Sequence, residues 1–433
     1  MGRRFAIQTF GCRVNQSDST RLARDLEASA WSRVQDPDHA ELVVLNTCTV
    51  THRSDADVRK AVHRIQRTRP GTKVLVTGCM AQRAPDQLVQ LGVHGVLGNS
   101  DKTRIAELSE RLWRGTRDPI VVHHPMEAEA PQVDPMGGVL DRSRPFVKIQ
   151  DGCDAHCTYC IIPEVRGRAR SAEPGRVLDA IRGLIDEGHH EVVLTGVHLG
   201  TYGVHLIPQT SFSELVHQIL DLPGLGRLRL SCIEPMAFPF DLVERARDDV
   251  RLAPHFHLPL QSGSDAILKR MVRPYRSRDF IGLLHDVRSR LPEACLGTDV
   301  IVGFPGESER DFEHTISTLE AADLDYVHVF SYSDREGTPS TRLSPKVEPG
   351  VIKRRCQVLT ALSAKRWKVF LHRRVGKLVD AVSLEARSGP DQMQALGADY
   401  TPFDVPVSSV PPNRPLRIRV ESVAGRRCRG RVA

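Results

Sequence analysis

Short apolar segments alternate with helix-like segments over most of this 433-residue chain. In residues 1–113, the apolar segments "RFAIQTF", "ELVVLN" and "KVLVTG" are each followed by a polar segment with helical character. Strands that alternate with helices form βαβ units, whose strands lie parallel in one sheet. The first 113 residues are therefore predicted to form a doubly wound α/β domain.

The alternation stops at residue 114 and resumes at residue 145. The stretch 114–144 is predicted to be a linker with little regular structure, because prolines and glycines interrupt it. These residues are Pro119, Pro125, Pro131, Pro135, Gly137 and Gly138. Residues 145–374 then contain six further strand segments: "PFVKIQ", "EVVLTG", "RLRLSC", "HFHLPL", "TDVIVGF" and "VHVFSY". Six βα units predict an open, partial (β/α)6 barrel, and a long basic helix over 350–374 closes the unit.

The last part of the chain, residues 375–433, has a different pattern. The segments "KLVDAVSLEA", "QMQALGADYTPFDVPV" and "RPLRIRVESV" are short alternating strands with Gly and Pro turns, which are typical of a small β-barrel. The predicted chain therefore has an N-terminal parallel-sheet domain, a central partial barrel and a small C-terminal β-barrel.

The cysteine content is informative only together with the expected compartment. The N-terminal segment does not resemble a secretory signal, and the longest apolar runs, such as "ELVVLN" and "DVIVGF", are far shorter than a membrane span. We therefore expect a soluble, cytoplasmic protein with no membrane partner. In that compartment, ten cysteines are better explained as metal ligands than as disulfides.

Three cysteines directly follow predicted strands of the N-terminal domain. Cys12 ends "AIQTFGC", Cys48 ends "LVVLNTC" and Cys79 ends "VLVTGC". The carboxyl ends of parallel strands lie along one edge of an open α/β sheet, where such folds bind their ligands. We therefore expect the three thiols to meet in a metal or cluster site. The alternative is that they are small buried residues that fill turns.

A denser cysteine group, "CDAHCTYC", follows the first strand of the predicted barrel and contains Cys153, Cys157 and Cys160. Structural zinc needs four ligands, and neither triple has an obvious fourth, since loop histidines such as His52 and His156 are more often solvated. Three thiolates on a 4Fe–4S cube instead leave one iron open to a substrate or cofactor. Packing roles are expected for the other four cysteines, Cys232, Cys295, Cys356 and Cys428.

The spacing of this group, with Tyr159 before its third cysteine and a partial barrel after it, resembles the radical S-adenosylmethionine (SAM) superfamily. The resemblance implies that Cys153, Cys157 and Cys160 hold a 4Fe–4S cluster whose open iron is chelated by the amino and carboxylate groups of SAM. Chelation would place the sulfonium beside the cluster, so that one electron cleaves it and releases a 5′-deoxyadenosyl radical.

The order of the domains and several further motifs resemble the methylthiotransferases. These motifs include "FGCRVNQSDS", "NTCTVT", "TGCMAQR", "KIQDGCDAHCTYCIIPEVRGRARS", "HFHLPLQSGSDAILKRMVRPY" and "FSYSDREGTP". The resemblance implies that Cys12, Cys48 and Cys79 hold an auxiliary 4Fe–4S cluster that carries the sulfur to be transferred. One SAM would methylate cluster-bound sulfide and a second SAM would supply the radical. An external one-electron reductant and a sulfur donor would be partners.

Within this family, "NTCTVT" and "GCDAHCTYCIIPEVRG" are most similar to the branch that modifies carbon 2 of N6-threonylcarbamoyladenosine at position 37 of tRNA. The branch acting on isopentenyladenosine more typically has "NSC" at the second cysteine, and the branch acting on a ribosomal-protein aspartate has "NTCGF". Both substrates remain alternatives. A third hypothesis is an RNA-binding iron–sulfur or zinc protein without catalysis.

Residues at the ends of the predicted barrel strands are candidates for further contacts with SAM, because active sites of such barrels lie at that end. In the turn "TGVHLGTYG", Gly196 would let the backbone approach the cofactor closely. Each candidate could equally be an ordinary turn residue. The candidates are Tyr159, Gly196, Glu234, Gln261, Ser262, Asp299 and Gly303.

Arginines are concentrated at the C-terminal end of a chain whose formal net charge is +7. The small terminal barrel resembles the TRAM module, an RNA-binding fold, and a basic face would bind phosphates. Because bases in A-form stems are hard to read, a flipped-out base of the tRNA anticodon loop is the expected target. The alternative is a solvated arginine run. The residues are Arg414, Arg417, Arg419, Arg426, Arg427, Arg429 and Arg431.

Overall fold

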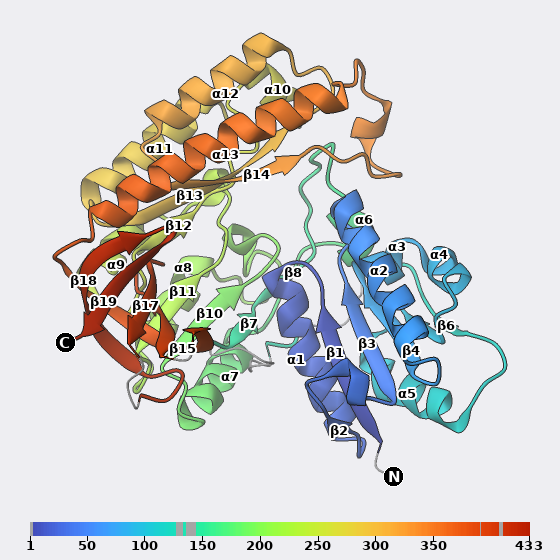
Figure 1. Cartoon of the computed structure of the whole chain (residues 1–433). Helices are drawn as coiled ribbons and strands as arrows, with labels where there is room; N and C mark the ends of the chain where they lie inside the picture. Colours follow the sequence, from blue (N-terminus) through green and yellow to red (C-terminus); the bar gives the residue numbers. More distant parts are fainter. Residues whose placement is uncertain (1–2, 127–132, 136–143, 390, 407–409) are drawn as a thin grey trace.

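The computed structural model describes residues 3–126, 133–135, 144–389, 391–406 and 410–433. Figure 1 shows three parts along the chain: an N-terminal α/β domain, a central half-open barrel and a small C-terminal β-barrel. The predicted fold class is therefore confirmed. Pro131, Gly137 and Gly138 of the expected linker lie outside the described residues.

The N-terminal domain is built on a six-stranded sheet in the order β2-β1-β3-β4-β5-β6. All neighbouring strands are parallel. The strands are β1 (Arg4–Thr9), β2 (Ser32–Arg33), β3 (Leu42–Thr47), β4 (Lys73–Gly78), β5 (Gly95–Leu97) and β6 (Ile120–Val122). The central strand β3 reads "LVVLNT" and is buried along its whole length, as expected of a strand covered on both faces.

Helices cover both faces of this sheet. Helices α1 (Arg13–Glu27) and α5 (Ile105–Arg114) bury residues such as Leu22 and Leu108 against one face. The other face is covered by α2, whose Val58 and Val62 belong to a second apolar cluster. The helices on that face are α2 (His52–Thr68), α3 (Cys79–Arg83) and α4 (Pro85–Gln90).

Strand β6 lies inside the range that the sequence predicted to be a linker. Its residues Ile120 to Val122 pair with Gly95 to Leu97 of β5, so the sheet extends beyond residue 113. The sequence did not reveal this strand, because "IVV" is only a short apolar run within a proline-rich stretch. The boundaries between the domains stay predictions.

The central domain contains the six predicted strands as two parallel sheets, β7-β10-β11 and β12-β13-β14. An isolated parallel bridge joins Leu228 of β11 to Leu252, three residues before β12, so the second sheet continues beside the first. The strands are β7 (Phe146–Lys148), β10 (Glu191–Thr195), β11 (Arg227–Leu230), β12 (His255–His257), β13 (Cys295–Val302) and β14 (Tyr326–Ser331). A short antiparallel pair, β8 (Gln150–Asp151) and β9 (Arg170–Ser171), flanks the second cysteine group.

The helices of this domain lie mostly on the outside of the curved sheet, where α11, α12 and α13 form the upper layer in Figure 1; the exception is α6, which packs against α3 of the N-terminal domain. The helices of this domain are α6 (Ile162–Arg166), α7 (Pro174–Asp186), α8 (Phe212–Leu220), α9 (Asp241–Asp248), α10 (Asp265–Arg270), α11 (Ser277–Arg290), α12 (Glu309–Ala321) and α13 (Pro349–His372). Single 3₁₀ turns are η1 (Pro37–His39), η2 (Lys102–Arg104), η3 (Leu199–Thr201), η4 (Pro235–Ala237) and η5 (Pro339–Arg342). In the described part of the chain, each helix is too short or too polar to cross a membrane.

The C-terminal domain is a closed barrel in the order β15-β16-β17-β19-β18. Its strands are β15 (Leu378–Gly389), β16 (Gln392–Gly397), β17 (Pro402–Pro406), β18 (Pro415–Ala424) and β19 (Arg427–Val432). The segment predicted as one strand unit from residue 392 divides into β16 and β17 at a turn where Tyr400 has a φ of +65°. Tyr400 packs against Arg229 of the central barrel, with 4.5 Å between the guanidinium carbon and the ring centroid.

Candidate functional site

The first cysteine triple lies at the carboxyl edge of the N-terminal sheet, as the sequence predicted. The strand register pairs Thr9 with Asn46 and Thr47 with Gly78, so the three strand ends are adjacent. Cys12 then caps α1, Cys48 follows β3 and Cys79 begins α3.

Two glycines allow these turns to approach one another. Gly11 has a φ of +98°, and a Cβ on it would lie 2.5 Å from the Cβ of Cys48. Gly78 has a φ of +95°, and a Cβ there would lie 2.4 Å from the carbonyl oxygen of Thr47. A side chain at either position would push the cysteine turns apart.

The thiols of the first triple influence one another electrostatically. Burial, reinforced by the thiols of Cys79 and Cys12, raises the pKa of Cys48 to about 12. Although Cys12 is exposed, desolvation by neighbouring protein atoms raises its pKa, and the Arg166 guanidinium opposes this effect. The Val50 N–H donates to Cys48 Sγ at 3.5 Å. Because the three thiols lie close enough to influence one another, one metal cluster could contact all of them. N–H donors to sulfur, such as that of Val50, are usual at iron–sulfur sites.

The second triple lies on the loop between β8 and α6. Gly152, with a φ of +73°, precedes Cys153 and faces the carbonyl oxygen of Arg168, which a Cβ would approach within 2.0 Å. The Cys153 N–H donates to Gly167 O at 3.1 Å, and the Cys160 N–H donates to Cys157 O at 3.0 Å. This small loop returns all three thiols to one side.

The thiols of the second triple are half-buried and also face one another. Burial, with the neighbouring Cys157 and Cys153 thiols, raises the pKa of Cys160 to about 12. The Ala155 N–H donates to Cys153 Sγ at 3.4 Å. The buried Arg273 donates from Nη1 to Cys157 Sγ at 3.4 Å. Three converging thiols with two N–H···S contacts fit a three-cysteine cluster.

A cavity of about 210 Å³ is lined by Cys160 of the second triple and by two residues that closely follow Cys48 of the first. Val50 and Thr51, just after Cys48, form one side, and Tyr159 and Cys160 of the second triple form another. The remaining lining comes from the start of α6 and from barrel strands and the residues that follow them, and it is largely apolar. Those residues are Ile161, Ile162, Gln261, Asp299, Ile301, Phe330, Ser331, Tyr332 and Ser333.

Three of the seven residues predicted to contact SAM line this cavity: Tyr159, Gln261 and Asp299. Gln261 has a φ of +70°, which turns the chain at the end of its strand. Glu234 lies apart from them and forms an ion pair with Arg273, so it acts next to the second triple.

The other three candidates have evident structural contacts. A Cβ on Gly196 would lie 3.0 Å from the Cβ of Gln150, whose Oε1 accepts from the Val197 and His198 N–H groups. Ser262 is buried and its Oγ accepts from the Ser264 N–H at 3.2 Å. Gly303 faces Ile352 of α13, which a Cβ would approach within 2.4 Å. Their predicted cofactor contacts stay predictions.

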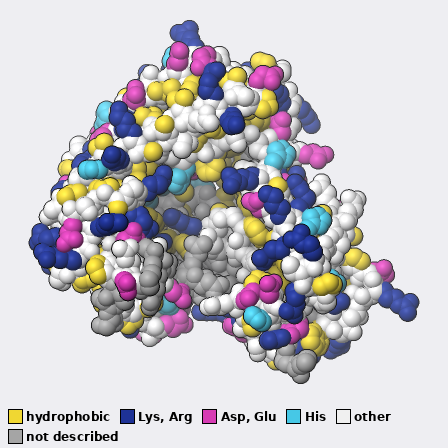
Figure 2. Space-filling model, in the orientation of Figure 1, with side chains coloured by type: hydrophobic (Ala, Val, Ile, Leu, Met, Phe, Trp, Pro, Cys, Tyr) yellow, Lys and Arg dark blue, Asp and Glu magenta, His cyan; other side chains and the backbone are white. Residues whose placement is uncertain are grey.

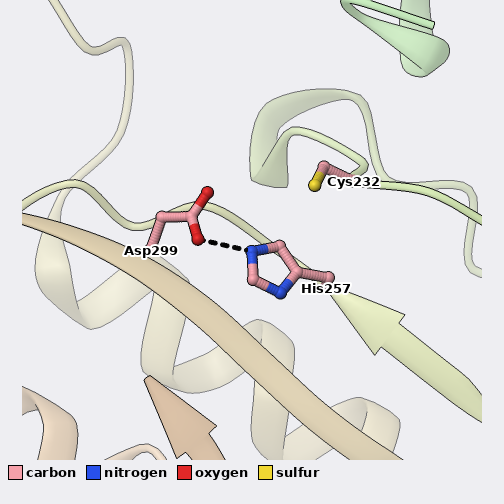
Figure 3. A group of neighbouring side chains, drawn as sticks. All are labelled: Cys232, His257 and Asp299. Carbon is pink, nitrogen blue, oxygen red and sulfur yellow. Dashed lines mark hydrogen bonds and ion pairs between the residues drawn. The ribbon is translucent and has the colours of Figure 1, made fainter. Parts of the chain in front are cut away.

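The packing role predicted for Cys232 is wrong. Its side chain is exposed, at the carboxyl end of β11, and points toward His257 and Asp299 (Figure 3). The prediction failed because Cys232 lies two residues beyond the end of β11, past the buried part of "LRLSC". Cys295 and Cys428, in contrast, are buried in an apolar cluster as expected, and Cys356 packs partly buried against the central core.

The Cys232, His257 and Asp299 group has donor atoms within 4.8 Å of one another, close enough for one metal ion to contact all three. In the described geometry, however, His257 Nε2 is hydrogen-bonded to Asp299 Oδ1 at 2.8 Å, and its Nδ1 to the hydroxyl of Tyr326 at 2.9 Å. Burial opposes ionisation of Asp299, but His257 and His328 outweigh it and lower the pKa of the carboxyl. The group therefore presents a carboxylate to the cavity.

Buried ion pairs fix the N-terminal domain to the barrel on one side of the cavity. Asp55 of α2 accepts from Thr49 Oγ1 at 2.7 Å, from Arg83 Nη2 at 3.0 Å and from Arg335 Nη1 at 2.6 Å. Arg335 belongs to the barrel domain and is fully buried. Arg335 belongs to the motif "FSYSDREGTP", but its role could not be inferred from the sequence, because its partner Asp55 lies 280 residues away.

A second buried ion group joins the domains near the first triple. Arg166, at the end of α6, donates from Nη1 to Asp151 Oδ1 at 2.8 Å and from Nη2 to Asp18 Oδ2 at 3.2 Å. Lys102 and Lys148 also contact Asp18. The sequence segment "EVRGRARS" could have indicated this group, because several arginines, Arg166 among them, follow the second triple there.

Comparisons with known proteins agree with this architecture. Residues 4–98 match the uncharacterized protein family UPF0004, and residues 147–319 match the radical SAM superfamily. The threonylcarbamoyladenosine tRNA methylthiotransferase MtaB of Rickettsia prowazekii is 35% identical over 376 residues, 86% of each chain. The chain belongs to the radical SAM methylthiotransferase family.

Relatives named for a different nucleoside are equally similar. The tRNA-2-methylthio-N(6)-dimethylallyladenosine synthase of Clavibacter michiganensis is 32% identical over 430 residues, covering 97% of this chain and 81% of that protein. The solved methyltransferase TsrM of Kitasatospora setae has a TM-score of 0.55 at 16% identity, over 76% of this chain and 73% of that chain. This last likeness concerns the fold. Membership of the radical SAM superfamily implies SAM and a 4Fe–4S cluster as cofactors.

Proposed function

We propose that this enzyme adds a methylthio group to carbon 2 of N6-threonylcarbamoyladenosine at position 37 of tRNA. The observation that carries the proposal is the cavity bounded on one side by Val50 and Thr51, which follow Cys48, and on another by Cys160 of the second triple. One cavity next to both triples suits a reaction that needs a radical source and a sulfur source on the same substrate. The relatives named for this nucleoside support the same reading.

In the proposed site each triple holds one 4Fe–4S cluster. When bound, the clusters and two SAM molecules supply the radical, the methyl group and the sulfur. Arg273 holds the second triple through its N–H contact to Cys157 and is itself oriented by Glu234. The apolar walls of the cavity exclude water, which protects a reactive radical. An external one-electron reductant and a sulfur donor are the proposed partners.

The proposed tRNA-binding surface is the outer face of β18 and β19. Arg417, Arg419, Arg429 and Arg431 are exposed there, and Figure 2 shows Lys and Arg side chains gathered at the edge of the molecule that carries this barrel. Arg419 lies directly opposite Arg431 in the strand register. Like charges in such a pair repel each other, and phosphates would relieve that repulsion. A tRNA substrate also favours a cytoplasmic location.

The test uses tRNA that carries threonylcarbamoyladenosine but lacks the methylthio group. The tRNA is incubated anaerobically with reconstituted enzyme, SAM, sulfide and reductant, and its nucleosides are then separated by liquid chromatography with mass detection. A mass gain that matches methylthio addition on threonylcarbamoyladenosine is the expected result. Cleavage of SAM with no modified nucleoside of any kind would contradict a tRNA substrate.

The second candidate substrate is isopentenyladenosine at the same position. The apolar lining of the cavity, which includes Ile161, Ile301 and Phe330, suits an isopentenyl group, and the relatives named for the dimethylallyl nucleoside are as similar as the others. Isopentenylated tRNA is therefore the matched second substrate in the same assay. Modification of that tRNA alone would reassign the substrate and leave the reaction type unchanged.

A further inference from the structure

A cavity of about 60 Å³ lies where the N-terminal domain meets the first strand of the barrel. Asp18 and Lys102 line it from one domain, and Lys148, Asp151 and Arg166 line it from the other. The side chains of these five residues are between 2% and 13% exposed. So many charged groups at low exposure need compensation from one another or from a ligand.

The compensation within this group is incomplete. Asp18 and Asp151 are its two carboxylates, and they face three cations, Lys102, Lys148 and Arg166. Arg170, which also lines the cavity, adds a fourth cation. A further pair at the cavity, Arg21 and Asp134, contact each other and cancel. Among the described residues that line the cavity, the cations therefore exceed the carboxylates by two.

Arg170 carries the clearest sign of a missing partner. Its Nη2 donates to the Arg166 carbonyl oxygen at 3.2 Å, but its Nε and Nη1 are buried and have no hydrogen-bond partner among the described residues. A buried donor without a partner is costly. Burial, together with the nearby Arg166, lowers the pKa of Arg170 despite Asp151. An anion in the cavity would satisfy both the donors and the charge.

The cavity adjoins the first cysteine triple. Asn99 lines it and donates from Nδ2 to Cys79 Sγ at 3.8 Å and to the Val165 carbonyl oxygen at 2.7 Å. Arg166 lies close enough to Cys12 to oppose the rise in that thiol's pKa. One layer of side chains thus separates the charged cavity from the thiols.

We propose that this cavity binds a small inorganic anion, and that the anion is hydrosulfide held in reserve for the first triple. About 60 Å³ accommodates a few water-sized particles, which admits a halide or hydrosulfide and excludes a nucleotide. The identity of the anion rests on the proposed function, in which each product consumes one sulfur atom. The anion site itself rests on the cavity, the charge excess and the unpartnered Arg170 donors.

The anion site is tested with bromide, whose anomalous scattering identifies it in crystals of the cluster-loaded enzyme grown without chloride. A bromide peak within hydrogen-bond distance of Arg170 and Lys102 is expected in the parent enzyme. It should vanish in Arg170→Met and persist in Arg182→Met, which removes an exposed arginine of α7. If Arg170→Met does not fold, Lys102→Gln replaces it and should weaken the peak. If only water is found in the cavity of the parent enzyme, the proposed anion site is wrong.

The sulfur assignment is tested by measuring methylthio formation as a function of sulfide concentration. Loss of one charged hydrogen bond should raise the half-saturating sulfide concentration of Arg170→Met about 10-fold or more, with cluster content unchanged. Bromide should compete with sulfide in the parent enzyme and in Arg182→Met. An unchanged half-saturating concentration overturns the assignment to hydrosulfide. If the parent enzyme forms no methylthio product, the proposed function fails, and the bromide peak still decides the anion site.

Discussion

The two cysteine triples are built in different ways for what is proposed to be the same type of cluster. The first collects residues 36 and 31 positions apart, and it exists only because three parallel strands end side by side. Two of its thiols, Cys48 and Cys79, are buried. The second triple occupies one eight-residue loop with half-buried thiols. The first site therefore depends on the whole domain fold, and the second depends mainly on its local loop.

This difference suits the two proposed tasks. A loop site with half-buried thiols leaves room for a large cofactor such as SAM, whose place is bounded by the barrel. A site on the edge of a rigid sheet keeps its position relative to the substrate. The buried Asp55–Arg335 and Asp18–Arg166 pairs then fix the distance between the two sites.

The largest expected effect is that replacing one triple abolishes its own activity and leaves the iron of the other triple in place. Cys153→Ala, Cys157→Ala and Cys160→Ala combined should abolish reductive SAM cleavage and remove about four of about eight irons. Replacing Cys12, Cys48 and Cys79 instead should remove a similar share of iron and abolish methylthio transfer, while SAM cleavage continues. Iron analysis and quantification of 5′-deoxyadenosine measure both outcomes. SAM cleavage that survives the first replacement would show that the roles of the triples are misassigned.

The next effect concerns Arg273, a side chain that donates to the second triple. Arg273→Met removes the N–H contact to Cys157 and leaves Glu234 unpaired near the thiols. Such partners of ligands commonly affect metal affinity or activity by about 10–100-fold, so SAM cleavage should fall by that factor. Lys269→Met, an exposed residue of α10, is the matched control. The iron bound by the first triple should stay unchanged, and a loss there would mean that Arg273 supports the fold and not one site.

A smaller effect should appear when the contact between the domains is weakened. Arg335→Met leaves Asp55 with Thr49 and Arg83 as partners, and removal of one member of a buried ion pair costs about 3–5 kcal/mol. We expect a lower melting temperature and more 5′-deoxyadenosine released per methylthio product, because the two triples are no longer held at a fixed distance. Arg342→Met, which changes an exposed residue nearby, should alter neither value. An unchanged ratio would exclude a positioning role.

Much of this organisation could be predicted from the sequence because it depends on local patterns. Alternating apolar and helical segments predicted the sheet and the partial barrel, and strand ends predicted that Cys12, Cys48 and Cys79 would meet. The loop of Cys153 and Cys160 could be predicted from spacing alone. Strand β6 could not, because its three residues are recognisable only from their pairing with β5.

The interdomain chemistry could not be predicted, for a physical reason. Asp55 and Arg335 are 280 residues apart, and an arginine in a loop is normally solvated, so neither residue alone indicates a buried pair. Arg273 was likewise hidden in a basic motif, and Cys232 was assigned to packing because it is a single cysteine outside any ligand pattern. These roles depend on how the domains and strands are placed, which single-residue patterns do not encode.

The smallest expected effect is on the pH dependence of stability, which the raised pKa of Cys48 in the first triple should change more than a thiol outside both triples does. Burial raises the pKa of Cys48 from 9.0 to about 12, so the folded, cluster-free protein favours the protonated thiol more than the unfolded chain does. That contribution to stability is fully present below pH 9 and is lost as the pH rises toward 12. The melting temperature of the cluster-free protein should therefore fall between pH 9 and pH 11, and less steeply in Cys48→Ala. Cys356→Ala, which removes a half-buried thiol outside both triples, should change the slope less. Equal slopes in all three proteins would mean that Cys48 is more accessible to solvent than its position at the end of β3 implies.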